Sequence, residues 1–160
     1  MNLEFIRTIF SVFSRSPTLQ CTIRELSKKA NLSYNATYRT IEDLLKEKIL
    51  QKRTFGKASV ISILPNNESI TLLSLAAYAK SKKQTIPIIT GTRAFIFSNH
   101  QIIGICEEKK TDTILVQQET VKMITIHEWI AEVNNNNKEI KNMEILQGAE
   151  YLYTKIFQTL

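Results

Sequence analysis

Four polar or aromatic side chains, Tyr34, Asn35, Tyr38 and Arg39, follow one another at the spacing of one helix face. An asparagine amide can form two hydrogen bonds with the edge of adenine, and a guanidinium can bind guanine or a phosphate. The two tyrosine hydroxyls are better suited to phosphate or sugar oxygens. This set of side chains therefore favours recognition of a nucleic acid, in which the asparagine and the arginine would read bases.

These side chains require a helix that begins near residue 33 and turns an apolar face inward. Ser33 is a favourable N-cap residue for such a helix. The expected inner face consists of four residues at helical spacing, Thr37, Ile41, Leu44 and Leu45. The face opposite Ile41 and Leu44 is then the one that carries the four candidate residues.

Two further helices are expected before this one. A first helix is predicted by apolar residues at helical spacing, Leu3, Ile6, Phe10 and Phe13. It should end before Pro17, which biases the preceding residue away from helix. Thr22 and Glu25 have the spacing of a capping box at the start of a second helix, and Asn31 tolerates the left-handed backbone of a tight turn. Two short helices separated by so few residues have helix-turn-helix spacing.

A β-hairpin is expected after the third helix, because two β-prone runs, 49–55 and 58–64, flank Gly56 and Lys57. The order helix, helix-turn-helix, hairpin is that of a winged helix. The runs TIRELSKKANLS (22–33) and YNATYRTIEDLL (34–45) resemble the second helix and the recognition helix of winged-helix transcriptional regulators of the broad MarR/ArsR type. The resemblance covers about residues 3–65. It departs from the family at Lys48, where glycine is frequent, and at Thr37, where valine is usual.

The resemblance implies a DNA-binding transcriptional regulator that represses or activates by occupying its operator, and that is not an enzyme. The third helix would enter the major groove, about 12 Å wide, while the hairpin contacts phosphates or the minor groove. The expected partners are double-stranded DNA and a second copy of the chain, on two half-sites about one helical turn apart. The candidate DNA-binding residues are Ser33, Tyr34, Asn35, Tyr38, Arg39, Lys28, Lys29, Lys52, Arg53 and Lys57.

Charge and composition agree with this hypothesis. Of the net charge of +6, residues 1–65 contribute +6, residues 66–86 contribute +2 and residues 87–160 contribute −2. The longest apolar stretch, 72–79, is far shorter than the ~20 residues that cross a membrane, and no signal-peptide pattern is present. We therefore expect a soluble, cytoplasmic protein with no membrane partner.

The expected fold class is α+β, with a winged-helix domain at 1–65, a connector at 66–86 and a small α/β domain at 87–160. Ser69 is expected to cap a connector helix, 70–80, which is apolar on more than one side and is a candidate dimer surface. The strands and helices expected beyond it are strands at 86–90, 94–97, 101–106, 113–117 and 121–125, with helices at 127–133 and from about 143 to the end.

No metal or cofactor is expected, because Cys21 and Cys106 are isolated and lack metal-ligand spacing. Cys106 and Trp129 are interpreted as core residues, and His127 as a residue at the start of a helix. Three roles for the C-terminal domain stay open: sensing a small-molecule effector, binding a protein partner, and stabilising a homodimer.

Two classes of function remain as alternatives to a regulator. One is a winged-helix adaptor that docks on another protein, as in antitoxin-like or polymerase-associated factors. The other is an enzyme with a DNA-targeting arm. Residues 90–93 and 111–116 faintly resemble nucleotidyltransferase elements but supply only Asp112 where a metal needs paired carboxylates. Asp112, Glu119 and Lys122 are similar to the acid-and-lysine set of metal-dependent nucleases.

Overall fold

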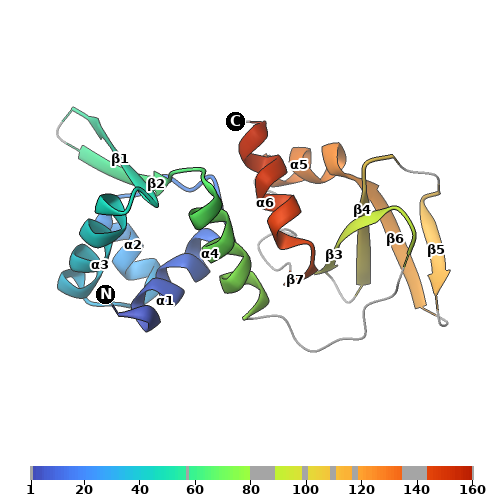
Figure 1. The fold of residues 1–160 in the computed structure, drawn as a ribbon, viewed down its shortest axis with the longest axis horizontal. Coiled ribbons are helices and arrows are strands. Elements are labelled where there is room, and N and C mark those ends of the chain that lie inside the picture. The colour runs from blue at the N-terminus through green and yellow to red at the C-terminus, as the bar shows by residue number, and fades with distance from the viewer. Residues whose placement is uncertain are drawn as a thin grey trace. The chain divides into compact units, whose positions relative to one another are not determined.

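The structure is a computed structural model that describes residues 2–56, 58–79, 89–98, 101–108, 111–116, 119–134 and 144–159. These residues form six helices and seven strands in two sheets, which confirms a mixed α+β class (Figure 1). The chain divides into two compact units, Met1–Ala76 and Ala77–Leu160. The division falls inside the expected connector.

Unit 1 begins with three helices, α1 (Leu3–Phe13), α2 (Ile23–Ala30) and α3 (Tyr34–Lys46), close to their expected positions. Asn2 caps α1, because its side chain accepts a hydrogen bond from the backbone N–H of Glu4 at 2.9 Å. The helices pack through buried apolar side chains, which include Ile9, Phe10, Phe13, Leu26, Ile41 and Leu44. This core holds α3 with its opposite face outward.

The start of α2 is fixed by the expected capping box. The Thr22 hydroxyl accepts a hydrogen bond from the Glu25 backbone N–H at 3.2 Å, and the Glu25 carboxylate accepts one from the Thr22 backbone N–H at 2.8 Å. Asn31 ends α2 in the left-handed conformation, with φ 53°. Ser33 then caps α3 by accepting from the Ala36 backbone N–H at 3.3 Å. The helix-turn-helix spacing is therefore produced by local side-chain chemistry.

The inner face of α3 differs from the expectation at one residue. Thr37, Ile41 and Leu44 are buried as expected, but Leu45 is only half-buried and Thr40 takes its place. Burial of Thr40 leaves no polar group unsatisfied, because its hydroxyl donates to the Ala36 carbonyl at 2.9 Å. Counting Leu45 as a core residue was therefore wrong.

The expected hairpin consists of β1 (Leu50–Phe55) and β2 (Ala58–Ile63), paired antiparallel with Leu50 opposite Ile63 and Phe55 opposite Ala58. Leu50, Ile61 and Ile63 are buried, so the base of the hairpin packs against the helices. Residues 52–56 are exposed. The hairpin is thus anchored at its base and open to solvent at its tip.

Helix α4 (Asn67–Tyr78) begins three residues earlier than expected, and the interpretation of Ser69 as its cap was wrong. The Asn66 side-chain oxygen accepts a hydrogen bond from the Ser69 backbone N–H at 2.8 Å. Ser69 is buried, and its hydroxyl donates to the Leu64 carbonyl at 2.7 Å. The Ser69 hydroxyl therefore ties the helix to the end of the hairpin. The expected linker at 80–85 lies outside the described residues.

Unit 2 contains a five-stranded sheet. Its elements are β3 (Thr92–Ser98), β4 (Gln101–Cys106), β5 (Thr113–Val116), β6 (Glu119–Thr125), α5 (Ile126–Asn134), β7 (Glu144–Gln147) and α6 (Ala149–Gln158). The strand order is β5-β6-β4-β3-β7, in which β4 and β6 are parallel and the other neighbours antiparallel. Four of the expected strands are present. Of the expected strand at 86–90, residues 89 and 90 are not in a strand and the rest lie outside the described part of the chain.

The expectation of one helix from about residue 143 was wrong, because residues 144–147 form β7. This strand pairs with β3, with Ile145 opposite Ile96. Gly148 then turns the chain into α6 with φ +76°, a conformation that L-residues rarely adopt. The apolar residues Ile145, Ala149, Leu152 and Ile156, which have helical spacing in the sequence, therefore belong to two different elements.

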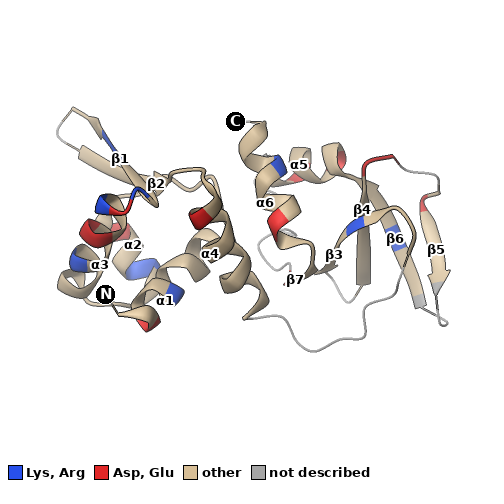
Figure 2. Cartoon of the chain, viewed as in Figure 1, with Lys and Arg blue, Asp and Glu red and all other residues tan. Residues whose placement is uncertain are grey.

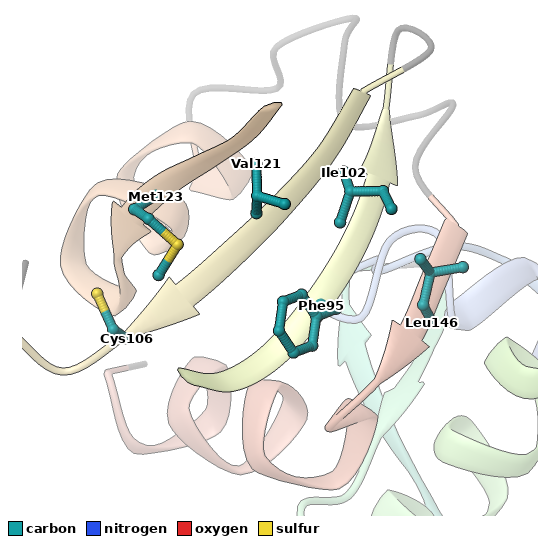
Figure 3. Packing of buried hydrophobic residues seen from close by; sticks show 6 residues of the cluster. All are labelled: Phe95, Ile102, Cys106, Val121, Met123 and Leu146. Atoms are coloured by element: carbon teal, nitrogen blue, oxygen red, sulfur yellow. The ribbon is translucent and has the colours of Figure 1, made fainter. Parts of the chain in front are cut away.

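Both faces of this sheet bury apolar side chains. Figure 3 shows one face, where Phe95, Ile102, Cys106, Val121, Met123 and Leu146 form a buried cluster. Helices α5 and α6 contact the sheet and each other, and carry the buried Trp129, Leu152 and Ile156. Cys106 and Trp129 are core residues, as expected, and His127 is exposed in the first turn of α5.

Candidate nucleic-acid interface

The exposed face of α3 presents all the candidate residues that this helix was expected to carry. The side chains of Tyr34 and Tyr38 are 51% and 43% exposed. Asn35, Arg39 and the capping Ser33 are exposed as well. The opposite face is held in the core by Ile41 and Leu44, so α3 cannot turn these side chains inward without exposing its apolar residues.

Tyr34 and Tyr38 form an aromatic pair on the protein surface. Their ring centroids are 6.2 Å apart and their planes are inclined by 30°. The spacing i, i+4 brings such side chains together on a helix. The contact restricts both rings, so two hydroxyls and a broad apolar surface are held side by side at the start of α3.

The tyrosine pair borders a surface depression of about 840 Å³ that joins three elements of unit 1. Its lining comes from α2 and its cap, the exposed face of α3 and both strands of the hairpin: Thr22, Ile23, Arg24, Ser27, Lys28, Tyr34, Tyr38, Lys52, Ala58 and Ser59. The expected residues Lys28 and Lys52 therefore meet the tyrosines in one place. Three cations line this hollow, and all three are exposed.

Arg24 is a lining residue that the sequence analysis did not select. It lies one helical turn before Lys28 on α2, so both side chains point from the same helix face. That spacing could have identified Arg24 as a candidate from the sequence. Ala58 and Ser59 carried no signal, because only the folding of the hairpin beside α2 brings them to the depression.

The remaining expected cations lie outside the depression. Lys29 and Arg53 are exposed on α2 and β1 but do not line it, and Lys57 lies outside the described residues. Figure 2 shows that Lys and Arg occur on α2, α3 and β1. The one acid in α2, Glu25, is engaged in the capping box, where the hydrogen bond from the Thr22 backbone holds the pKa of its carboxyl below the ordinary value.

Unit 2 brings charged side chains together around Glu107, whose carboxylate lies 3.4 Å from the Lys155 ammonium. No group of three or more His, Cys, Asp or Glu side chains that could hold a metal ion is found among the described residues. Asp112 uses its backbone carbonyl to accept from the Met123 N–H at 2.8 Å, at the start of the β5–β6 hairpin. Among the helices of the described residues, none is long and apolar enough to cross a membrane.

Comparison of the chain with protein-family models, with curated proteins and with solved structures found no match. Function is therefore inferred from the surface of unit 1. The relevant observation is that the polar face of α3, the cations of α2 and the hairpin share one continuous depression.

Proposed function

We propose that unit 1 is a winged helix and that the chain is a sequence-specific, DNA-binding transcriptional regulator. The observation that carries this proposal is the exposure of Tyr34, Asn35, Tyr38 and Arg39 on α3, beside a depression lined by cations of α2 and β1. The order of three helices and a hairpin supports it. Groups that bind base edges and groups that bind phosphates thus occur on one surface.

In this proposal α3 enters the major groove of duplex DNA with its N-terminal half. Asn35 and Arg39 hydrogen-bond to base edges, which supplies sequence information. The hydroxyls of Tyr34 and Tyr38 contact sugar or phosphate oxygens. The depression beside them, with Arg24, Lys28 and Lys52, accommodates the phosphate backbone and supplies most of the affinity.

The test is a selection of duplexes from a randomised pool with the full chain, followed by titration of the recovered duplex at several salt concentrations. We expect a common sequence motif and an affinity that falls steeply with salt. Asn35→Ala should cost about 1–3 kcal/mol of binding free energy and relax specificity at one base pair. The proposal would be contradicted if the selection yields no common motif and the full chain binds no duplex even at low salt.

A second copy of the chain is part of the same proposal. One winged helix reads few base pairs, whereas two copies read half-sites separated by roughly 10 base pairs. Unit 2 would stabilise this dimer or bind a small-molecule or protein effector. A footprint with two protected half-sites, together with the mass of the complex in sedimentation, measures the stoichiometry.

A protein-docking adaptor is the alternative that a separate observation favours. A second depression in unit 1, of about 510 Å³, is lined by Leu3, Ile6, Leu44, Ile49 and Leu72 with three polar residues of α4. Leu3 is 80% exposed beside it. If docking is the function, Leu3→Asp should abolish activity in cells, while Asn35→Ala combined with Arg39→Ala should leave it intact.

A further inference from the structure

A large apolar side chain stands at the tip of the hairpin. Phe55 is the last residue of β1, lies opposite Ala58, and is 59% exposed. Gly56 follows in the left-handed conformation, and no heavy atom lies within 4 Å of the position that its Cβ would occupy. Figure 1 shows the hairpin extending beyond the helices of unit 1. Phe55 is therefore exposed near the end of a projecting hairpin.

Cations occur on both faces of the hairpin that carries this ring. Because side chains alternate along a strand, Arg53 shares the face of Phe55 and Lys52 lies on the other face. The sequence of the hairpin, 50–63, contains Lys52, Arg53 and Lys57 and no acid. An apolar tip between cations suits a partner that is anionic outside and apolar inside.

Duplex DNA has this character, because two phosphate strands enclose stacked bases whose apolar faces become accessible where a base step is unstacked. The surface of an anionic membrane has it as well. DNA is favoured because Lys52 and Ala58 of the hairpin line the same depression as Tyr34 and Tyr38 of α3. Phe55 does not itself line this depression, but Ala58, the residue directly opposite it in the hairpin, does. The tip thus adjoins the surface that also exposes the hydrogen-bonding Asn35, a group that has no partner in an acyl layer.

We propose that Phe55 inserts as a wedge between two base pairs in the minor groove, beside the half-site read by α3, and thereby bends the duplex. This inference rests on the proposed function and adds a specificity-determining residue to it. Apolar wedges of this kind unstack one base step and kink DNA by about 20–90°. The insertion favours flexible pyrimidine–purine steps, so it selects sequence where α3 makes no contact.

The bend is measured by energy transfer between dyes on the two ends of the duplex recovered by the full chain. Wild-type protein should shorten the end-to-end distance. Phe55→Ala should still bind but lose most of the shortening, whereas Phe55→Leu, which keeps an apolar wedge, should retain it. Leu115→Ala, which removes an exposed apolar side chain from strand β5 of unit 2, is the matched control and should bend the duplex as wild type does.

Two further measurements test insertion itself. Replacing the flexible base step under the tip by an A-tract should weaken wild-type binding roughly tenfold or more and leave Phe55→Ala unaffected. The one tryptophan of the chain, Trp129, is buried in unit 2, so Phe55→Trp adds a separate reporter. Its fluorescence should be quenched when the duplex is added, because the indole stacks on a base.

The outcomes separate the two proposals. If no duplex binds, the proposed function and the wedge both fail. If duplexes bind but wild type and Phe55→Ala give the same end-to-end distance, only the wedge fails. If the fluorescence of Phe55→Trp responds to phosphatidylserine vesicles and not to the duplex, the tip contacts a membrane and the wedge is likewise wrong.

Discussion

Cys21 and Ile61 exchange two backbone hydrogen bonds: the Cys21 N–H donates to the Ile61 carbonyl at 3.2 Å, and the Ile61 N–H donates to the Cys21 carbonyl at 2.7 Å. This bridge ties β2 to the residue that directly precedes the cap of α2. The bridge therefore joins two segments that both line the cation-lined depression, one through Thr22 and the other through Ser59. The hairpin is positioned by this bridge as well as by its apolar base.

The thiol of Cys21 makes the stability of unit 1 sensitive to alkaline pH. The side chain is 3% exposed, and its burial raises the pKa to about 11 from an ordinary value of 9.0. The unfolded state therefore loses its proton first as the pH rises above 9, and the stabilising contribution of the neutral thiol is lost between pH 9 and about 11.

We expect the free energy of unfolding to fall by about 2–3 kcal/mol across this range on account of Cys21. Denaturant unfolding followed by circular dichroism measures it. Cys21→Ala should show a correspondingly shallower decline, because lysines and tyrosines titrate in both proteins alike. Equal declines in the two proteins would show that the Cys21 thiol is not the cause.

Lys48 adopts a conformation that favours glycine. Its φ is +58°, and hydrogen bonds from the Asn66 side chain to its carbonyl and from its own N–H to Leu45 hold it there. A left-handed conformation costs an L-residue about 1–2 kcal/mol, and the greater chain entropy of glycine offsets part of that. Lys48→Gly should therefore raise the free energy of unfolding by about 0.5–1 kcal/mol in urea titrations.

Lys46→Gly provides the matched control for this prediction. It is the same substitution two residues earlier, in the last turn of α3. It should lower the free energy of unfolding by about 0.5–1 kcal/mol, because glycine weakens a helix. If both variants lose stability, the backbone at Lys48 is not strained.

What the sequence predicted well was set by neighbouring residues. The capping box of Thr22 and Glu25, the left-handed Asn31 and the glycine turn of the hairpin each depend on groups within a few positions of one another. The exposed face of α3 was predicted from the helical spacing of its apolar residues alone. Lys48, where the winged-helix resemblance leads to the expectation of glycine, does adopt a left-handed conformation.

What the sequence did not predict depends on contacts between distant residues. The start of α4 is an exception, because the contacts made there by the Ser69 N–H to the Asn66 side chain and by the Ser69 hydroxyl to the Leu64 carbonyl are local. Ile145 in β7 has helical spacing with the apolar residues of α6, so the sequence alone predicts one helix. Pairing with β3, which is distant in the sequence, makes residues 144–147 a strand. Arg24 and Ser59 meet in the depression because the hairpin packs beside α2.

Gly148 is required for the turn from β7 into α6. A Cβ at this position would meet the backbone carbonyl of Arg93 and lie 2.6 Å from the Cβ of Ala94, and φ is +76°. Gly148→Ala should therefore destabilise unit 2 by about 3 kcal/mol, from backbone strain and overpacking together. Denaturant unfolding followed by the fluorescence of Trp129 reports on this unit.

Gly91→Ala separates the two causes. Gly91 also has a positive φ, +86°, but nothing lies within 4 Å of the Cβ position. This variant should lose only about 1 kcal/mol, the cost of the backbone conformation. A loss as large as that of Gly148→Ala would mean that the contact with Arg93 contributes nothing.

Lys52 and Asn35 should affect DNA binding in different ways, because one is proposed to contact phosphate and the other a base. Lys52→Ala should lower affinity for every duplex alike and reduce the slope of log K against log salt by about 1, since one fewer counterion is released. Asn35→Ala should leave the slope unchanged and weaken binding only to the recovered duplex.

Arg7→Ala, which removes an exposed cation of α1 outside the depression, is the charge-matched control and should change neither the affinity nor the slope. If Arg7→Ala lowers the slope as much as Lys52→Ala does, the interaction is with the overall charge of unit 1, and the depression has no special part in it.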